Sequence, residues 1–212
     1  MNFWIGYTPK YPKAFEVCKA SLEQYGIKCY QVPSYYEPNV NTPFTRSRFL
    51  VPYLDKLVSD NRWVAYCDDD FLFLDDPQQL AKDLLIWKDI YCVKHPTYNS
   101  SVKRKSMGKQ VNYPMKNWSS FMIMNKYSLE YDLDIFKHSL QDLHRFEWIP
   151  LKDICIGELP ITWNWLVGEY EENVDNLKAL HYTLGGPWYG KKAHSSSYNK
   201  IWLDYAKSII KK

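Results

Sequence analysis

The sequence predicts an α/β fold: a mostly parallel central sheet with helices on both faces, in a single domain over residues 1–212. Short apolar runs that are typical of strands alternate with amphipathic segments along the first half of the chain. Such alternation favours a parallel sheet whose strands are joined by helices. With 212 residues and 46% hydrophobic content, the chain is large enough to bury one packed core.

The expected elements follow one another at short intervals. Strands are predicted over residues 2–7, 27–32, 63–67 and 90–93. Helices are predicted over residues 12–25, which Gly26 closes, over about 44–59, from Asp76-Pro77 onward, and over about 195–212.

Composition excludes several classes of partner. The 27 Lys and Arg against 24 Asp and Glu give a net charge of +3, too small for a protein that lives on nucleic acid or on an anionic membrane. No run approaches the roughly 18 apolar residues of a membrane span, and the first residues do not resemble a signal peptide. The five scattered cysteines are typical of reduced thiols. We therefore expect a cytoplasmic protein without a membrane span.

Two compositional features leave alternatives open. The 9 Trp and 18 Tyr suit the binding of sugars or nucleosides, and they also suit a tyrosine-rich core. Residues 90–129 contain no Asp or Glu, and they include a predicted loop over 97–114 that is rich in Lys, Ser, Gly and Asn. This loop is either a solvated basic segment or a lid over an anionic substrate.

Three consecutive aspartates, Asp68, Asp69 and Asp70, directly follow the predicted strand 63–67. In parallel sheets, ligands bind at the carboxyl ends of strands. Side chains two positions apart on extended backbone point the same way, so Asp68 and Asp70 should converge while Asp69 faces aside. Two adjacent carboxylates require a cation, and oxygen ligands suit Mg²⁺ or Mn²⁺. The alternative is a solvated acidic turn.

These residues and three further segments, in the same order, resemble the glycogenin and bacterial galactosyltransferase group of GT-A-fold glycosyltransferases. The segments are FTRSRFLVP with Arg48, LPITWN with Asn164, and ALHYTLGGPW with His181. The compact size and the string YCDDDFLFL further resemble the capsid-protein glycosyltransferase domain of chloroviruses. The match covers residues 1 to about 190. It implies a single domain with a nucleotide-binding part over about 1–93, an acceptor-side part over about 94–190 and a final helix over about 195–212.

The resemblance implies a metal-dependent transfer of a hexose or deoxyhexose from a UDP-sugar to an acceptor glycan or glycoprotein, with a lean toward retention at the anomeric carbon. It implies that Asp68, Asp70 and His181 bind Mn²⁺ or Mg²⁺, and that Tyr7 and Thr8 hold the uracil. Arg48 contacts phosphate or sugar, and Asp153 contacts the sugar or acts as a base. The implied donor-binding set also contains Asp68, Asp69, His181, Gly186, Trp188 and Lys191.

Two departures from the family pattern stand out. Gly186 replaces the lysine that precedes Pro-Trp, so Lys191, Lys192 or Arg46 would have to supply the phosphate cation. Trp118-Ser119-Ser120 replaces an Asn-Ala/Ser-Gly segment, so sugar specificity does not transfer. Two alternatives to a transferase are a non-catalytic carbohydrate-binding module and a D-x-D phosphatase, although Leu72 stands where the phosphatase would have Thr or Val.

Overall fold

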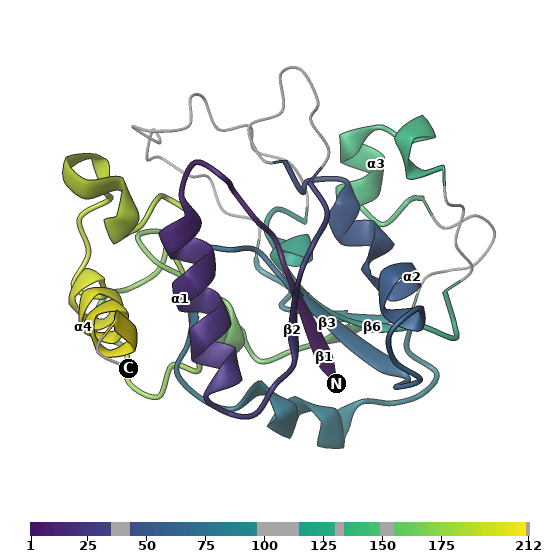
Figure 1. The fold of residues 1–212 in the computed structure, drawn as a ribbon. Helices are drawn as coiled ribbons and strands as arrows, with labels where there is room; N and C mark the ends of the chain where they lie inside the picture. The colour runs from purple at the N-terminus through teal and green to yellow at the C-terminus, as the bar shows by residue number, and fades with distance from the viewer. Residues whose placement is uncertain (35–42, 97–114, 130–133, 149–154, 211–212) are drawn as a thin grey trace.

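The computed structural model describes residues 1–34, 43–96, 115–129, 134–148 and 155–210. Its centre is a six-stranded sheet with the order β2-β1-β3-β6-β5-β7 (Figure 1). The strands are β1 (Asn2–Ile5), β2 (Cys29–Gln31), β3 (Trp63–Cys67), β5 (Ile90–Cys92), β6 (Phe121–Asn125) and β7 (Ile156–Glu158). Only β6 runs antiparallel to its neighbours in this sheet. The predicted mostly parallel sheet is therefore confirmed.

Helices cover both faces of this sheet because every strand in its middle is apolar on both sides. Phe3, Ile5 and Cys67 pack with α1 (Pro12–Glu23) in one core cluster. Their neighbours along the strands, such as Trp4 and Tyr66, point to the other face, where they pack with the residues around α2 (Val51–Lys56) and α3 (Leu140–His144). Alternate residues of each strand thus serve two separate cores, as the pleat requires.

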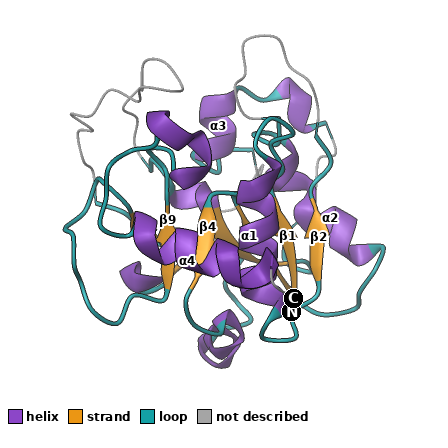
Figure 2. Ribbon diagram, turned by 60° about the vertical axis from the view of Figure 1, so that its left-hand side comes forward, coloured by secondary structure: helices purple, strands orange, loops and turns teal. Residues whose placement is uncertain are grey.

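A second, three-stranded sheet has the order β4-β9-β8 and carries the last helix. Its strands are β4 (Phe71–Phe73), β8 (Trp165–Leu166) and β9 (Ala179–His181), and α4 (Asn199–Ile210) packs beside α1 (Figure 2). The pairing of β4 with β9 sets Phe71 opposite His181. Two segments more than a hundred positions apart in the sequence thereby meet directly after Asp70.

Two predicted helices differ from the observed elements. The single helix expected over 44–59 is wrong: a 3-10 helix, η1 (Ser47–Leu50), precedes α2. Pro52 lies in the first turn of α2, where its missing N–H is tolerated, and it cannot continue the hydrogen bonds of a preceding α-helix. The segment after Asp76 is also a 3-10 helix, η2 (Pro77–Asp83), and the Asp76 carboxylate accepts a hydrogen bond from the Gln78 amide at 2.9 Å.

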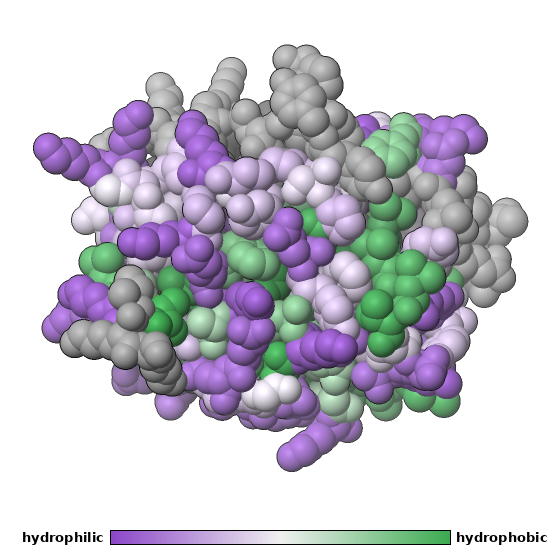
Figure 3. Space-filling model, viewed as in Figure 1, coloured by the Kyte–Doolittle hydropathy of each residue, from purple (hydrophilic) through white to green (hydrophobic). Residues whose placement is uncertain are grey.

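Among the described ranges, no helix combines the length and the apolar composition that crossing a bilayer requires. The exposed surface does contain apolar side chains. Tyr53, Leu57 and Val58 are exposed on and just after α2, and green apolar atoms gather over that helix in Figure 3. These residues lie on the α2 side of the sheet, away from the aspartates that follow β3.

Candidate metal and nucleotide site

Asp68, Asp69 and Asp70 form the turn that joins β3 of the large sheet to β4 of the small one. The backbone of this turn is held from both sides. The Asp68 amide donates to the Ser120 carbonyl at 2.9 Å, and the Asp70 carbonyl accepts from the Tyr182 amide at 2.9 Å. The turn therefore fixes the three carboxylates relative to both sheets.

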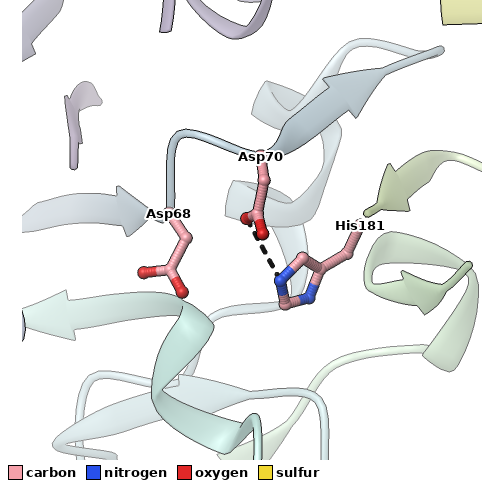
Figure 4. A group of neighbouring side chains, drawn as sticks. All are labelled: Asp68, Asp70 and His181. Carbon is pink, nitrogen blue, oxygen red and sulfur yellow. Dashed lines mark ion pairs between the residues drawn. The ribbon is translucent and has the colours of Figure 1, made fainter. Parts of the chain in front are cut away.

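Asp68, Asp70 and His181 converge on one point, and their ligand atoms lie within 4.8 Å of one another (Figure 4). His181 Nε2 lies 3.2 Å from Asp70 Oδ1, while Nδ1 pairs with Asn164 Oδ1 at 2.8 Å. Asn164 in turn donates from Nδ2 to Ser120 Oγ at 2.9 Å. This chain of contacts fixes the ring with Nδ1 as the donor and Nε2 facing the carboxylates, which is the orientation of a metal-ligating histidine.

Arg48 holds Asp68 from the opposite side. Its Nη1 lies 3.0 Å from Asp68 Oδ1 and donates to the Ser119 carbonyl at 3.0 Å. The Tyr66 hydroxyl donates to the same Asp68 oxygen at 2.5 Å, and the guanidinium lies over the Tyr66 ring at 5.2 Å. Burial raises the pKa of Tyr66 well above its ordinary value, so the phenol stays protonated and able to donate.

The surroundings of the acidic turn disfavour negative charge on its carboxyl groups. Burial raises the pKa of Asp68, and the neighbouring Arg48 opposes that rise. Burial, with a further contribution from Asp70, raises the pKa of Asp69 to about 8, although Asp69 accepts a hydrogen bond from the Thr8 amide at 2.7 Å. Raised carboxyl pKa values show that the surroundings disfavour the accumulated negative charge. Two carboxylates and an imidazole nitrogen therefore fit a divalent cation such as Mn²⁺.

A pocket of about 310 Å³, a volume that includes space open to solvent, lies beside the aspartates. Tyrosine and tryptophan rings flank it, and the rings of Tyr11 and Tyr189 lie 4.3 Å apart. The residues that line it are Thr8, Tyr11, Ala14, Asp69, Asp70, Tyr182, Thr183, Gly185, Trp188 and Tyr189. Carboxylates next to aromatic rings suit a ligand that has a flat base and an anionic group bound to a metal.

Several residues that were predicted to bind the sugar donor lie in or near this pocket. Thr8 and Trp188 line it, whereas Tyr7 packs edge to face on Phe15 of α1 at 5.1 Å. A Cβ at Gly186 would lie 2.3 Å from the Trp188 ring, so glycine at this position allows the indole to lie against the backbone. Lys191 is exposed on the 3-10 helix η6 (Pro187–Lys192) and is not part of the pocket lining.

The structure also describes Arg46 and Lys192, the other two residues that could replace the family's lysine. Arg46 donates from Nη1 to the His138 carbonyl at 2.6 Å, and Lys192 is exposed. Asp153 and the predicted loop over 97–114 lie outside the described residues. The structure therefore brings together the proposed metal ligands with Arg48, and it does not bring Lys191 or Lys192 into the pocket.

Sequence reasoning did not assign the residues that support the ligands, and it named Asn164 and Ser120 only as members of motif segments. Tyr66 stands two positions before Asp68 and shares its side of the strand, a spacing that was visible in the sequence. Ser120 and Asn164 orient His181 across two separate segments, and no local pattern connects them. Tyr11 and Tyr189 complete the pocket from α1 and η6.

One curated relative supports a family assignment. Protein CDI of Arabidopsis thaliana is 30% identical in an alignment that covers 89% of this chain and 79% of that protein. No family model matches the chain.

Solved glycosyltransferase structures share the fold. The galactosyltransferase LgtC aligns with a TM-score of 0.62 and 13% identity, over 98% of this chain and 96% of that one. GlyE of Streptococcus pneumoniae aligns with a TM-score of 0.61 and 12% identity, over 97% of this chain and 60% of that one. A glycosyltransferase involved in glycosylation of the major capsid of PBCV-1 aligns with a TM-score of 0.52 and 12% identity, over 100% and 98%. The chain therefore has the GT-A fold, and the resemblance in the sequence is confirmed.

Proposed function

Because the chain belongs to the family of Arabidopsis Protein CDI and has the GT-A fold, we propose that it is a glycosyltransferase that uses a UDP-sugar. It would transfer a hexose or deoxyhexose to a hydroxyl of an acceptor glycan or glycoprotein. One observation carries this proposal: Asp68, Asp70 and His181 converge beside an aromatic pocket of about 310 Å³. An acidic cation site next to a ring-binding pocket matches the two ends of a nucleoside diphosphate.

In this proposal Asp68, Asp70 and His181 hold Mn²⁺ or Mg²⁺. When bound, the cation would neutralise negative charge on the departing diphosphate. Asn164 keeps the His181 ring in its ligand orientation, with Nδ1 at 2.8 Å from the amide oxygen. Arg48 keeps Asp68 in place through its 3.0 Å contact and adds positive charge beside the diphosphate.

The nucleotide would occupy the pocket between α1 and η6. Thr8, Tyr11, Trp188 and Tyr189 line it, and the three aromatic rings can stack on a base or exclude water from the donor. Tyr7 and Asp69 support Thr8: Tyr7 precedes it, and Asp69 accepts its backbone N–H at 2.7 Å. Gly186 allows the position of Trp188, whereas Lys191 is exposed and does not line the pocket.

The stereochemical course is part of the proposal. We infer retention at the anomeric carbon from the resemblance to the glycogenin group. Asp153 as a general base would instead give inversion. NMR of the anomeric proton in the first product separates the two, because retention preserves the donor's α configuration and inversion gives the β product.

The acceptor side is proposed from the sequence. Residues 1–93 would serve the nucleotide and residues 94–190 the acceptor, with the basic segment over 97–114 as a lid. The resemblance to the chlorovirus domain implies a viral capsid glycoprotein as the acceptor and the host cytoplasm as the location, and both stay predictions. The chlorovirus neighbour supports the fold of such an enzyme, while the curated relative is a plant protein.

Thermal unfolding with UDP, GDP or TDP, each with and without Mn²⁺, tests the proposal. We expect UDP and Mn²⁺ together to raise Tm, with little effect of either alone, since a ligand stabilises the state that binds it. A carbohydrate-binding module would respond to glycans without nucleotide or metal. A phosphatase would hydrolyse phosphate esters and would leave a UDP-sugar intact. Asn125→Ala, a change at the far edge of the sheet, is the control that should keep the UDP and Mn²⁺ response.

A further inference from the structure

His95 lies at the same edge of the large sheet as the acidic turn. Strands β3 and β5 both run antiparallel to β6, so the carboxyl ends of β3 and β5 lie on the same side of the sheet. Asp68 follows the end of β3, and His95 follows the end of β5 after a tight turn in which its amide donates to the Val93 carbonyl at 3.0 Å. His95 is nevertheless buried, with only 4% of its surface exposed.

The ring of His95 is held by one nitrogen only. Its Nδ1 lies 2.7 Å from the Tyr170 hydroxyl, and its backbone carbonyl accepts from the Trp118 indole at 3.0 Å. Its Nε2 is buried and has no hydrogen-bond partner among the residues that the structure describes. A buried polar atom without a partner is destabilising, so such an atom requires an explanation.

Trp118, whose indole donates to the His95 carbonyl, belongs to the segment that also positions the proposed metal ligands. Trp118 begins η3 (Trp118–Ser120). The next residue, Ser119, accepts from Arg48 at its carbonyl, and Ser120 accepts from the Asp68 amide and from Asn164. Through η3, His95 is therefore tied to the same support as Asp68 and His181. This is the segment where the chain departs from the family pattern.

The electrostatic setting agrees with this placement. Burial lowers the pKa of His95 to about 3, and the nearby His181 contributes to the shift. Burial also raises the pKa of Tyr170 to about 12. Near neutral pH the pair therefore consists of a neutral imidazole and a neutral phenol. A neutral pair suits an uncharged hydroxyl better than a phosphate.

On the basis of the glycosyltransferase function proposed above, we propose that His95 recognises a sugar: its Nε2 exchanges a hydrogen bond with a hydroxyl group of the sugar bound in the active site. Tyr170 fixes the ring by donating to Nδ1, which leaves the proton on Nε2 for donation to the sugar oxygen. Trp118 holds the backbone at this position. The hydroxyl belongs either to the transferred sugar or to the acceptor sugar, since both would meet at this edge.

The experiment compares wild type, His95→Phe, His95→Gln and Tyr170→Phe. Tyr198→Phe, which removes a buried hydroxyl near α4, is the matched control. The donor arm measures UDP release from UDP-glucose, UDP-galactose and UDP-xylose with Mn²⁺ and no acceptor. The acceptor arm measures the KM for methyl glycosides with the preferred donor. Stabilisation by UDP and Mn²⁺ reports the nucleotide site separately.

We expect the His95 variants to keep UDP and Mn²⁺ stabilisation and to lose about tenfold or more in discrimination between sugars, in one of the two arms. Tyr170→Phe should show a smaller loss in the same arm, and Tyr198→Phe none. Unchanged discrimination in both arms, in an active His95→Gln protein, would overturn the inference and leave the glycosyltransferase intact. A wild type that neither binds UDP with Mn²⁺ nor releases UDP would overturn both.

Discussion

Two clusters of charged side chains lie at opposite ends of the strands of the central sheet, one fully buried and one partly buried. At the amino-terminal edge of β1 and β3, Lys126 pairs with Asp55 at 2.7 Å, and both side chains are fully buried. Asp55 also accepts from Asn2 at 2.8 Å and from the Trp4 indole at 3.0 Å, and Lys126 donates to the Ser59 carbonyl. This cluster holds equal charges of opposite sign.

The cluster at the carboxyl-terminal edge is built differently. Asp68, Asp69 and Asp70 stand together beside Arg48, and the pKa values of Asp68 and Asp69 are raised by burial. The protein therefore places more negative charge here than its own cations balance. A balanced pair of this kind holds a fold together, whereas an excess of one sign prepares a site for a ligand of the other sign. The comparison separates a structural cluster from a functional one.

Asp55→Asn should have the largest effect on folding. It leaves the Lys126 ammonium buried without a counter-ion, so we expect a loss of about 3–5 kcal/mol in the free energy of unfolding, measured with urea. The folded fraction should still bind UDP with Mn²⁺. The double variant Asp55→Leu with Lys126→Met should recover much of the loss. A fully stable Asp55→Asn protein would break the comparison.

Asn164→Ala should act on the other cluster. It removes the amide that orients His181 at 2.8 Å, and such supporting contacts typically contribute about 10–100-fold to metal affinity. We expect the Mn²⁺ concentration for half-maximal stabilisation in the presence of UDP to rise by that factor. Asn125→Ala, which removes a buried amide at the opposite edge, should weaken folding and leave the Mn²⁺ dependence unchanged. Equal Mn²⁺ dependence in both variants would contradict the assignment.

The effect of His144 on the pH dependence of stability gives a third test. Burial, with contributions from Arg48 and Arg46, lowers its pKa to about 3. As pH falls, this histidine becomes protonated near pH 6.5 in the unfolded chain but only near pH 3 in the folded chain. The free energy of unfolding therefore decreases as pH falls from about 6.5 toward 3. The slope from this group is at most about 1.4 kcal/mol per pH unit. Urea unfolding of His144→Asn between pH 4 and 6 should show a flatter slope than His138→Asn, and identical slopes would refute it.

The sequence predicted the elements whose signal is local. The strand over Trp63–Cys67 and the start of α1 at Pro12 agree with the structure because apolar periodicity and proline position act within a few residues. Asp68 and Asp70 converge as expected, but they do so on a turn between β3 and β4 rather than on an extended segment. The GT-A fold itself came from the order of several motifs.

The elements that sequence reasoning missed depend on distant partners. Strands β4 and β9 pair with each other although they lie far apart in the sequence, and no feature within either segment predicts that pairing. The prediction of one helix over 44–59 was wrong because apolar periodicity does not reveal that η1 ends and α2 begins just before Pro52. The contacts of Ser120, Asn164 and His95 join segments that only the folded chain brings together.

The central claim is that the acidic turn is a donor site completed by a cation. Manganese-dependent release of UDP from a UDP-sugar by Asp70→Asn, with urea stability measured on the same preparation, tests it most directly. The account predicts that release falls by about a hundredfold or more while stability is equal to or above that of wild type, because the change removes charge from a crowded site. Wild-type release by a stable Asp70→Asn protein would contradict it.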